Sequence, residues 1–364
     1  MANTLELLAE SRPDLAVDRR PHLDRISYAP EMFVETGILR RDINLVTGLI
    51  NRYMSRDDKN RRSIHLSGEA GSGKTWLMYR LKEILGLQKL DVTYIDCLED
   101  PQFIDYPTDL PEGSVLLLDN IYQLEWEDLE KLEAEFITPL MTQDKVAFIF
   151  SGRGRLFPWA NPQLRIFAEP IELGNFDRSQ TFFQLKSQAP GSESRAEEIH
   201  QLSGGYPLAN YALTKLEPDQ ALDYALGEML KFIPSSHNRS VRNAIQALSV
   251  LDGFNEVDIP PILESYLGQD MPAQSQRAVR DLLLSYSLAG YDTEKGRYRI
   301  PPAVRILAEN FLRVINPELW RNLHQTAQEH FEELAENFEG IPATLLHFSQ
   351  RTEYHQQQLS LDKS

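Results

Sequence analysis

Cysteine and long apolar runs are what this sequence lacks most clearly. Cys97 is the single cysteine, so no disulfide can form within the chain and packing alone must hold the fold. No run of 18 or more apolar residues occurs, which speaks against a membrane-spanning helix. Charges interrupt the apolar residues between Met1 and Asp24, so we expect no signal peptide there. Together these absences predict a cytoplasmic protein that does not contact a membrane.

Positive charge is also in deficit. The 364 residues include 37 Lys and Arg against 54 Asp and Glu, which gives a formal net charge of −17 at pH 7. Such a surface repels phosphate backbones over roughly a Debye length, about 8 Å at physiological salt. Binding of a nucleic acid would therefore need a local basic patch that opposes this field.

The first half of the chain alternates between strand and helix patterns. Its length allows about two to four domains, and its composition is typical of globular proteins. Short apolar or β-rich runs are separated by helical patterns, which predicts a parallel sheet covered by helices on both faces. We expect the strands at Ser63–Ser67, Val92–Cys97, Val115–Leu118, Val146–Phe150 and Pro170–Leu173.

Helical patterns dominate after residue 175. Residues 239–313 give three helical patterns followed by a short ribbon, an order typical of a winged helix. The two strands of the ribbon are expected at Leu288–Tyr291 and Arg297–Ile300, and Pro317 restarts a final helical region. Four helices are expected before this part, at residues 178–186, 194–201, 207–216 and 220–232.

A glycine-rich octapeptide follows the first predicted strand and opens the next helix. Its glycines let several backbone N–H groups face one point, and the helix start adds its positive end, so the segment suits phosphate. Lys74 would supply charge to the β- and γ-phosphates, Thr75 would bind Mg²⁺, and Trp76 is counted with the nucleotide site. The octapeptide is a P-loop and predicts binding of ATP or ADP with Mg²⁺: Gly68, Glu69, Ala70, Gly71, Ser72, Gly73, Lys74 and Thr75.

A second motif supports the first. Residues 115–119 form an apolar run that ends in a carboxylate, Asp119, 45 residues after Lys74. In such a Walker-B arrangement the aspartate holds Mg²⁺ at the end of a central strand. Asn120 follows, where many ATPases of this type carry an acid, and an amide cannot accept a proton from water. We therefore expect slow hydrolysis; Glu125 and Glu127 could partly substitute, or could simply be solvated.

An arginine follows the next predicted strand. Arg153 comes directly after Phe150-Ser151-Gly152, and an arginine at this place can reach the γ-phosphate with its always-charged, two-pronged head group. Arg155 lies two positions further into the loop, so Arg153 is the better candidate. The alternative for Arg153 is a surface arginine in a loop.

The order of these features resembles the STAND NTPases, signal-transducing relatives of AAA+ ATPases that include NB-ARC and NACHT proteins. The resemblance covers roughly residues 31–350, from the P-loop to Leu323-His324 and Leu346-His347 behind the winged helix. Gly205-Tyr206-Pro207-Leu208 is similar to a family motif, which implies that Pro207 packs near the adenine; a proline that opens a helix is the alternative. Pro301 stands where many members have a phosphate-contacting histidine; Arg299 or Arg305 could replace it, and the alternative for each is a surface charge.

The resemblance implies both an architecture and a role. The fold is expected to be an α/β P-loop NTPase domain, AAA+/STAND-like, followed by helical parts. The expected division is an N-terminal arm (1–30), a nucleotide-binding domain (31–175), a helical lid (176–234), a winged helix (235–313) and a C-terminal helical segment (314–364). The nucleotide would switch the molecule between a closed form and one that assembles or binds a partner protein.

Two other functions stay open at the level of sequence. One is an AAA+ initiator or loader that binds DNA through its winged helix, although Arg277 and Arg280 are the only basic residues of the helix expected at Ala273–Ser287. The other is a regulatory module that binds nucleotide without hydrolysing it, a hypothesis that Asn120 favours.

Overall fold

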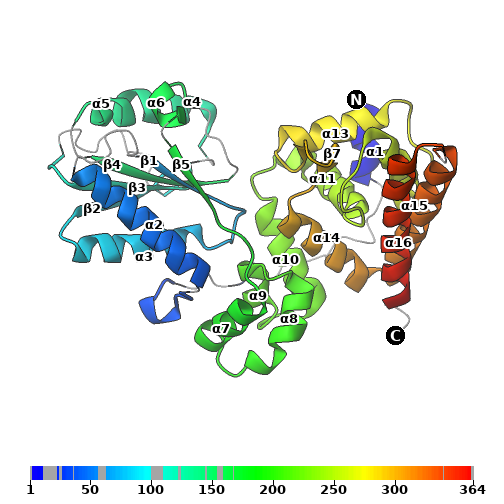
Figure 1. Cartoon of the computed structure of the whole chain (residues 1–364), viewed down its shortest axis with the longest axis horizontal. Helices are drawn as coiled ribbons and strands as arrows, with labels where there is room; N and C mark the ends of the chain where they lie inside the picture. Colours follow the sequence, from blue (N-terminus) through cyan, green and yellow to red (C-terminus); the bar gives the residue numbers. More distant parts are fainter. Residues whose placement is uncertain are drawn as a thin grey trace. The chain divides into compact units, whose positions relative to one another are not determined.

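The chain divides into two compact units in the computed structural model (Figure 1). We call residues 24–200 and 205–211 the P-loop unit, and residues 1–23, 201–204 and 212–364 the helical unit. No helix among the described residues is long and apolar enough to cross a membrane. The structure describes residues 2–10, 23, 27–35, 37–55, 63–99, 110–121, 124–143, 146–153, 159–166, 168–338 and 340–361.

A five-stranded parallel sheet forms the centre of the P-loop unit. Its strand order is β2-β3-β4-β1-β5, and every pair of neighbours is parallel. The carboxyl ends of all five strands therefore meet at one edge of the sheet. The predicted strands are all present, with ends shifted by at most two residues: β1 (Ser63–Ser67), β2 (Asp91–Asp96), β3 (Ser114–Asp119), β4 (Ala147–Gly152) and β5 (Ala168–Glu172).

Helices cover both faces of this sheet, as the apolar strands require. Successive residues of a strand point to opposite faces, so Val115 and Leu117 join one apolar core while Leu116 and Leu118 join the other. On one face lie α2 (Gly37–Met54) and α3 (Lys74–Leu87). The other face carries α4 (Trp126–Lys131), the π-helical segment η5 (Leu132–Ile137), α5 (Thr138–Met141) and α6 (Pro162–Ile166).

Short helices follow the sheet and connect the two units. The first, α7 (Arg178–Gln188), begins with a capping box in which Asp177 and Gln180 exchange side-chain and backbone hydrogen bonds. The chain crosses between the units three times in this region, because residues 205–211 belong to the P-loop unit while residues 201–204 and 212 onward belong to the helical unit. The other helices of this region are α8 (Ala196–Ser203), α9 (Pro207–Ala212) and α10 (Pro218–Met229), with the short 3-10 segment η6 (Glu193–Arg195). A second 3-10 segment, η2 (Pro30–Met32), precedes the sheet in the sequence.

The helical unit contains the predicted sequence of three helices and a ribbon. The ribbon strands β6 and β7 are antiparallel, and Phe254 adds a bridge to Tyr298. The name winged helix and the five-part division stay predictions. The elements are α11 (Ser235–Leu248), η7 (Glu256–Asp258), α12 (Ile259–Leu267), α13 (Ser275–Ser285), β6 (Gly290–Asp292), β7 (Arg297–Arg299), α14 (Pro302–Ile315), α15 (Pro317–Asn337) and α16 (Pro342–Leu361).

The N-terminal helix α1 (Ala2–Glu10) packs within the helical unit. Ser240 and Asn243 of α11 donate side-chain hydrogen bonds to the carbonyl oxygens of Leu5 and Leu8, the first at 2.7 Å and the second at 2.5 Å. These polar contacts fix α1 on α11 in addition to the burial of Leu8. The predicted fold class is confirmed: an α/β P-loop domain with a parallel sheet, followed by a helical region.

Candidate phosphate-binding site

The P-loop joins β1 to α3 and needs glycine at specific positions. Gly68, Gly71 and Gly73 have φ angles of 155°, 91° and 95°, a region that other residues rarely adopt. A Cβ atom on Gly68 would lie 2.6 Å from the Oγ of Ser72, and one on Gly71 would lie 2.7 Å from the Cβ of Leu208. Backbone conformation thus favours glycine at all three positions, and close packing adds to this at Gly68 and Gly71.

Helix α3 presents an uncapped N-terminus to the loop. Gly73 is its N-cap residue and offers no side chain to the first N–H groups of the helix. Thr75 and Trp76 lie in that first turn, which contains no acidic residue. Unsatisfied N–H groups and the positive end of the helix favour an anion at this point. The ring of Trp76 meets that of Tyr28 edge-on, with centroids 5.5 Å apart. A contact of Trp76 with the nucleotide stays a prediction.

Lys74 is enclosed by the loop it follows. Its Nζ donates hydrogen bonds to the carbonyl oxygens of Gly68 and Glu69, each at 2.9 Å. Burial lowers the pKa of Lys74 to about 8, against the opposing effects of Asp119 and Glu69, and the charge of Arg153 lowers it further. A desolvated ammonium group beside bare amides is a suitable partner for phosphate oxygens.

Asp119 ends β3 and is completely buried. Its Oδ2 accepts a hydrogen bond from the hydroxyl of Tyr94 at 3.0 Å, and its Oδ1 accepts one from the hydroxyl of Ser151. Burial, followed by the charge of Asp119, raises the pKa of Tyr94, so this phenol remains a donor. These bonds orient the carboxylate as a metal-binding group requires.

The residues present fit a triphosphate with Mg²⁺. Thr75 and Asp119 stay the predicted protein ligands of the ion. No group of three His, Cys, Asp or Glu side chains in the described part of the chain could hold a metal. Phosphate oxygens and water would therefore supply the other ligands, which is usual for Mg²⁺ at phosphate sites.

Asn120 follows Asp119 and has a left-handed backbone, with φ at 59°. Its backbone N–H donates to the Oδ1 of Asp119 at 2.9 Å, and its side-chain Nδ2 donates to the Oδ1 of Asp96 at 3.0 Å. Glu125 and Glu127, the acids considered from the sequence, lie exposed at the start of α4. Sequence reasoning missed Asp96, although it ends a strand in the same way as Asp119.

Arg153 lies at the end of β4, beside the P-loop. Its Nε lies 2.8 Å from the Oε2 of Glu69, and only 15% of the Arg153 side chain and 17% of the Glu69 side chain are exposed. Burial lowers the pKa of Arg153, while Glu69 and Tyr206 act in the opposite direction. Arg153 is thus not a free surface arginine; it contacts the loop that would hold the γ-phosphate. Arg155 falls outside the described residues.

The segment 205–208 packs directly on the P-loop. A Cβ atom on Gly71 would lie 3.0 Å from the hydroxyl of Tyr206, and Leu208 is closer still. Pro207 is buried, opens α9, and accepts a hydrogen bond on its carbonyl from Gln184 at 2.8 Å. Its position as first residue of a helix explains the proline in structural terms. Contact of Pro207 with an adenine stays a prediction.

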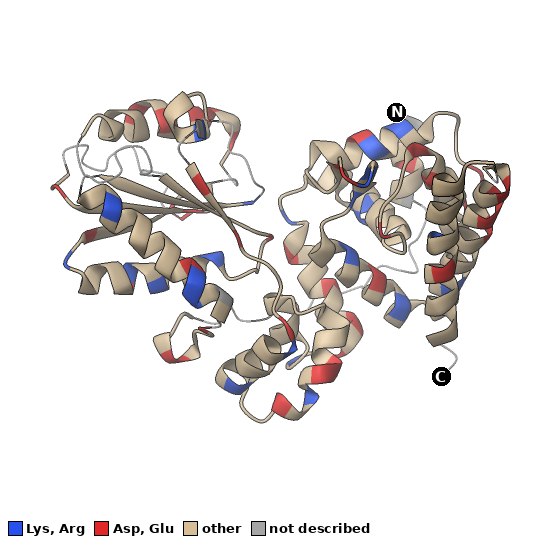
Figure 2. Cartoon of the chain, viewed as in Figure 1, with Lys and Arg blue, Asp and Glu red and all other residues tan. Residues whose placement is uncertain are grey.

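Basic and acidic residues are interspersed along the helices of the helical unit (Figure 2), and several of its arginines form ion pairs. On α13, Arg280 pairs with both Glu256 and Asp281. Arg299 lies 3.3 Å from an oxygen of Asp292, and Arg305 lies 2.7 Å from one of Glu309. These pairs neutralise the charge that binding to DNA phosphates would need, and they leave the suggested phosphate role of Arg299 and Arg305 a prediction.

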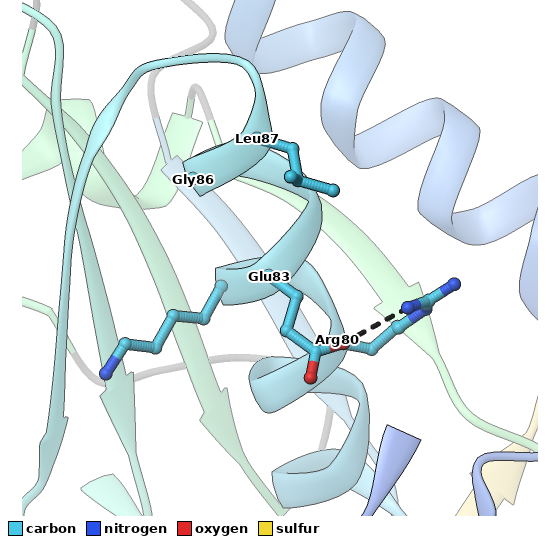
Figure 3. Close-up of a pocket in the computed structure, with 5 residues that line it drawn as sticks. Arg80, Glu83, Gly86 and Leu87 are labelled. Atoms are coloured by element: carbon cyan, nitrogen blue, oxygen red, sulfur yellow. Dashed lines mark hydrogen bonds and ion pairs between the residues drawn. The ribbon is translucent and has the colours of Figure 1, made fainter. Parts of the chain in front are cut away.

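A shallow depression lies further along α3, away from the P-loop (Figure 3). It has a volume of about 580 Å³. Arg80 and Glu83, one turn apart on α3, form an ion pair at 3.1 Å beside it, and Leu87, which also lines it, is exposed. Lys82 and Gly86 complete the lining. None of the predicted site residues lines this depression, so we do not assign the nucleotide to it.

Comparison with known proteins finds distant structural likenesses and no family. No family model and no curated protein matches the sequence. The chain is similar to the RuvB Holliday junction branch migration motor of Thermotoga maritima, with 17% identity over 74% of this chain and 92% of that one and a TM-score of 0.41. For Cdc6p of Pyrobaculum aerophilum the identity is 13%, the shares are 84% and 98%, and the TM-score is 0.35.

A third similar structure is a chain of the E. coli MS115-1 HORMA:CdnC:Trip13 complex, with 15% identity, 57% and 88% coverage and a TM-score of 0.38. Likenesses this distant carry no argument about function. Any argument about function must rest on the residues of this chain instead. They form a P-loop NTPase fold.

Proposed function

We propose that this chain binds ATP or ADP with Mg²⁺ at the P-loop and acts as a nucleotide-dependent conformational switch or assembly scaffold of the AAA+/STAND type. Hydrolysis of ATP would be slow and would reset the switch. The observation that carries the nucleotide site is the enclosed ammonium group of Lys74, hydrogen-bonded to loop carbonyls at the uncapped start of α3.

The observation that supports a switch is the pair between Arg153 and Glu69. Glu69 is part of the P-loop, so a γ-phosphate bound there competes with it for the guanidinium group. ADP lacks this phosphate and leaves the pair intact. One charge-assisted contact contributes about 1.5–3 kcal/mol, which can shift a population roughly 10- to 150-fold. The 10- to 150-fold range is an upper limit, because Arg153 gives up its contact with Glu69 when it binds the γ-phosphate.

The chain offers a route by which the change could spread. Tyr206 lies close enough to Arg153 to affect its pKa, and Tyr206 and Leu208 pack on Gly71 of the P-loop. Residues on either side of this segment belong to the helical unit. A movement of Arg153 that displaces the segment would thus pull on the chain at residues 204 and 212, where it passes into the helical unit on either side of the segment.

Native mass measurement of the purified protein tests this proposal. We expect the wild type with ATP or a non-hydrolysable analogue to differ in assembly state or in mobility from the wild type with ADP. Arg153→Ala should lose this difference and bind ATP up to roughly 10- to 150-fold more weakly, with ADP affinity unchanged. Arg165→Ala removes an exposed arginine of α6 and serves as the matched control.

The proposal would be wrong if ATP and ADP gave the same assembly state in the wild type and Arg153→Ala bound both nucleotides as the wild type does. A nucleotide-binding module without hydrolysis is the second candidate, which the amide at Asn120 favours. Release of inorganic phosphate by the wild type, absent in Lys74→Ala, would exclude that candidate.

A further inference from the structure

The side chains of Asp96 and Asn120 meet where β2 and β3 end, beside Asp119, the carboxylate proposed to bind Mg²⁺. Asp96 is the last residue of β2 and is paired in register with Asp119, the last residue of β3. Paired residues on neighbouring parallel strands point to the same face, so both carboxylates leave the sheet edge on one side. Asp96 is half-buried, whereas Asp119 is completely buried.

Hydrogen bonds hold one oxygen of Asp96 in place. The Oδ1 accepts from the Nδ2 of Asn120 at 3.0 Å and from the backbone N–H of Leu98 at 3.0 Å. Among the described residues, no donor is directed to the Oδ2. The left-handed backbone of Asn120 aims its amide at Asp96 while its own N–H binds Asp119. Asn120 therefore connects the two carboxylates.

The other acids near the site are engaged, exposed or not held in one orientation. In the proposed ATP state Glu69 loses its partner Arg153 to the γ-phosphate, so this ion pair no longer orients it. Asp119 accepts hydrogen bonds from three donors and is the proposed metal ligand. Glu125 and Glu127 lie exposed at the start of α4. Asp96 is thus the acid that combines a fixed orientation with a place beside Asp119.

We propose that Asp96 is the general base of ATP hydrolysis and that Asn120 is the residue that positions it. This assignment rests on the proposed function, because it needs ATP at the P-loop. In the step, an O–H bond of the attacking water breaks and its proton passes to the Asp96 carboxylate. The water oxygen bonds to the γ-phosphorus while the bond from that phosphorus to the β–γ bridging oxygen breaks, and the electron pair leaves with ADP.

The chemistry of the Asn120 side chain suits a residue that positions the base and is not the base itself. The amide can donate to a carboxylate but cannot accept the proton itself. The acid, Asp96, is the last residue of β2, whereas the amide, Asn120, directly follows the last residue of β3. Asp96 reaches solvent on its exposed side, so its proton can return to water after each turnover.

Single-turnover cleavage of ATP with Mg²⁺, measured with protein in excess, separates chemistry from binding. We expect Asp96→Asn, which keeps the size of the side chain, to slow cleavage by about 10²- to 10⁴-fold. Its affinity for ATP, measured by calorimetry, should stay at the wild-type value. Asp91→Asn changes an exposed aspartate at the opposite end of β2 and should leave both quantities unchanged. Glu125→Gln should also behave as the wild type.

Asn120→Ala tests the same hydrogen bond without removing the carboxylate. This variant should slow cleavage of ATP and leave the affinity for ATP unchanged. An unfolded protein would lose both the cleavage and the affinity. Cleavage at the wild-type rate in Asp96→Asn would overturn the assignment, and so would a wild type that binds ATP but never cleaves it. A wild type that binds neither ATP nor ADP would instead refute the proposed function.

Discussion

Raising the pH from 7 to 9 should weaken ATP binding about tenfold. Burial lowers the pKa of Lys74 to about 8 in the nucleotide-free structure. About nine-tenths of the molecules then carry a charged Lys74 at pH 7, and about one-tenth at pH 9. The phosphates of bound ATP favour the charged form and raise the pKa of Lys74 in the complex. The affinity therefore falls as the pH rises through 8, in proportion to the charged fraction.

Isothermal titration calorimetry in two buffers of different ionisation enthalpy measures both the affinity and the proton uptake. We expect close to one proton, about 0.9, taken up per ATP at pH 9 and about 0.1 at pH 7. Lys74→Arg is the control, because its guanidinium stays charged at both values and should give weaker but pH-independent binding. Equal wild-type affinity at pH 7 and pH 9, without proton uptake, would refute the reasoning.

Two further predictions concern the geometry around the site. Gly205→Ala should destabilise the P-loop unit by about 2 kcal/mol or more, because its Cβ would lie 1.8 Å from the carbonyl oxygen of Phe176 at a φ of 76°. Thermal unfolding checks this against Gly86→Ala in α3, which meets no atom and should stabilise by about 0.5–1 kcal/mol; equal melting temperatures would contradict it. Tyr94→Phe removes a hydrogen bond to Asp119 and should weaken Mg²⁺-dependent ATP binding roughly tenfold in calorimetry, with binding in excess EDTA unchanged. Unchanged Mg²⁺ dependence would show that the phenol does not orient Asp119.

The features predicted correctly from sequence are those encoded by local patterns. The continuous apolar run at Val115–Leu118 predicts a buried strand because a parallel strand is covered on both faces. The strand ends were less exact, since they depend on partners elsewhere in the chain. β4, for example, continues to Gly152 because that residue pairs with Ser67 of β1.

The candidate site also has some parts that the local sequence predicts and others that depend on residues far apart in the chain. The P-loop can be predicted because all its parts lie within eight consecutive residues. The pair between Glu69 and Arg153 and the bond between Asp96 and Asn120 join residues that are far apart in sequence. Strand order decides which of these side chains meet, and no local pattern reveals it. The docking of α1 on α11 was missed for the same reason.

Calorimetric titration of the wild type with ATP and Mg²⁺ at pH 7, beside Lys74→Ala, tests the central claim most directly. The account predicts saturable binding at one site in the wild type and its loss in a Lys74→Ala protein that melts as the wild type does. Absence of binding in the folded wild type, or equal binding in both proteins, would contradict it.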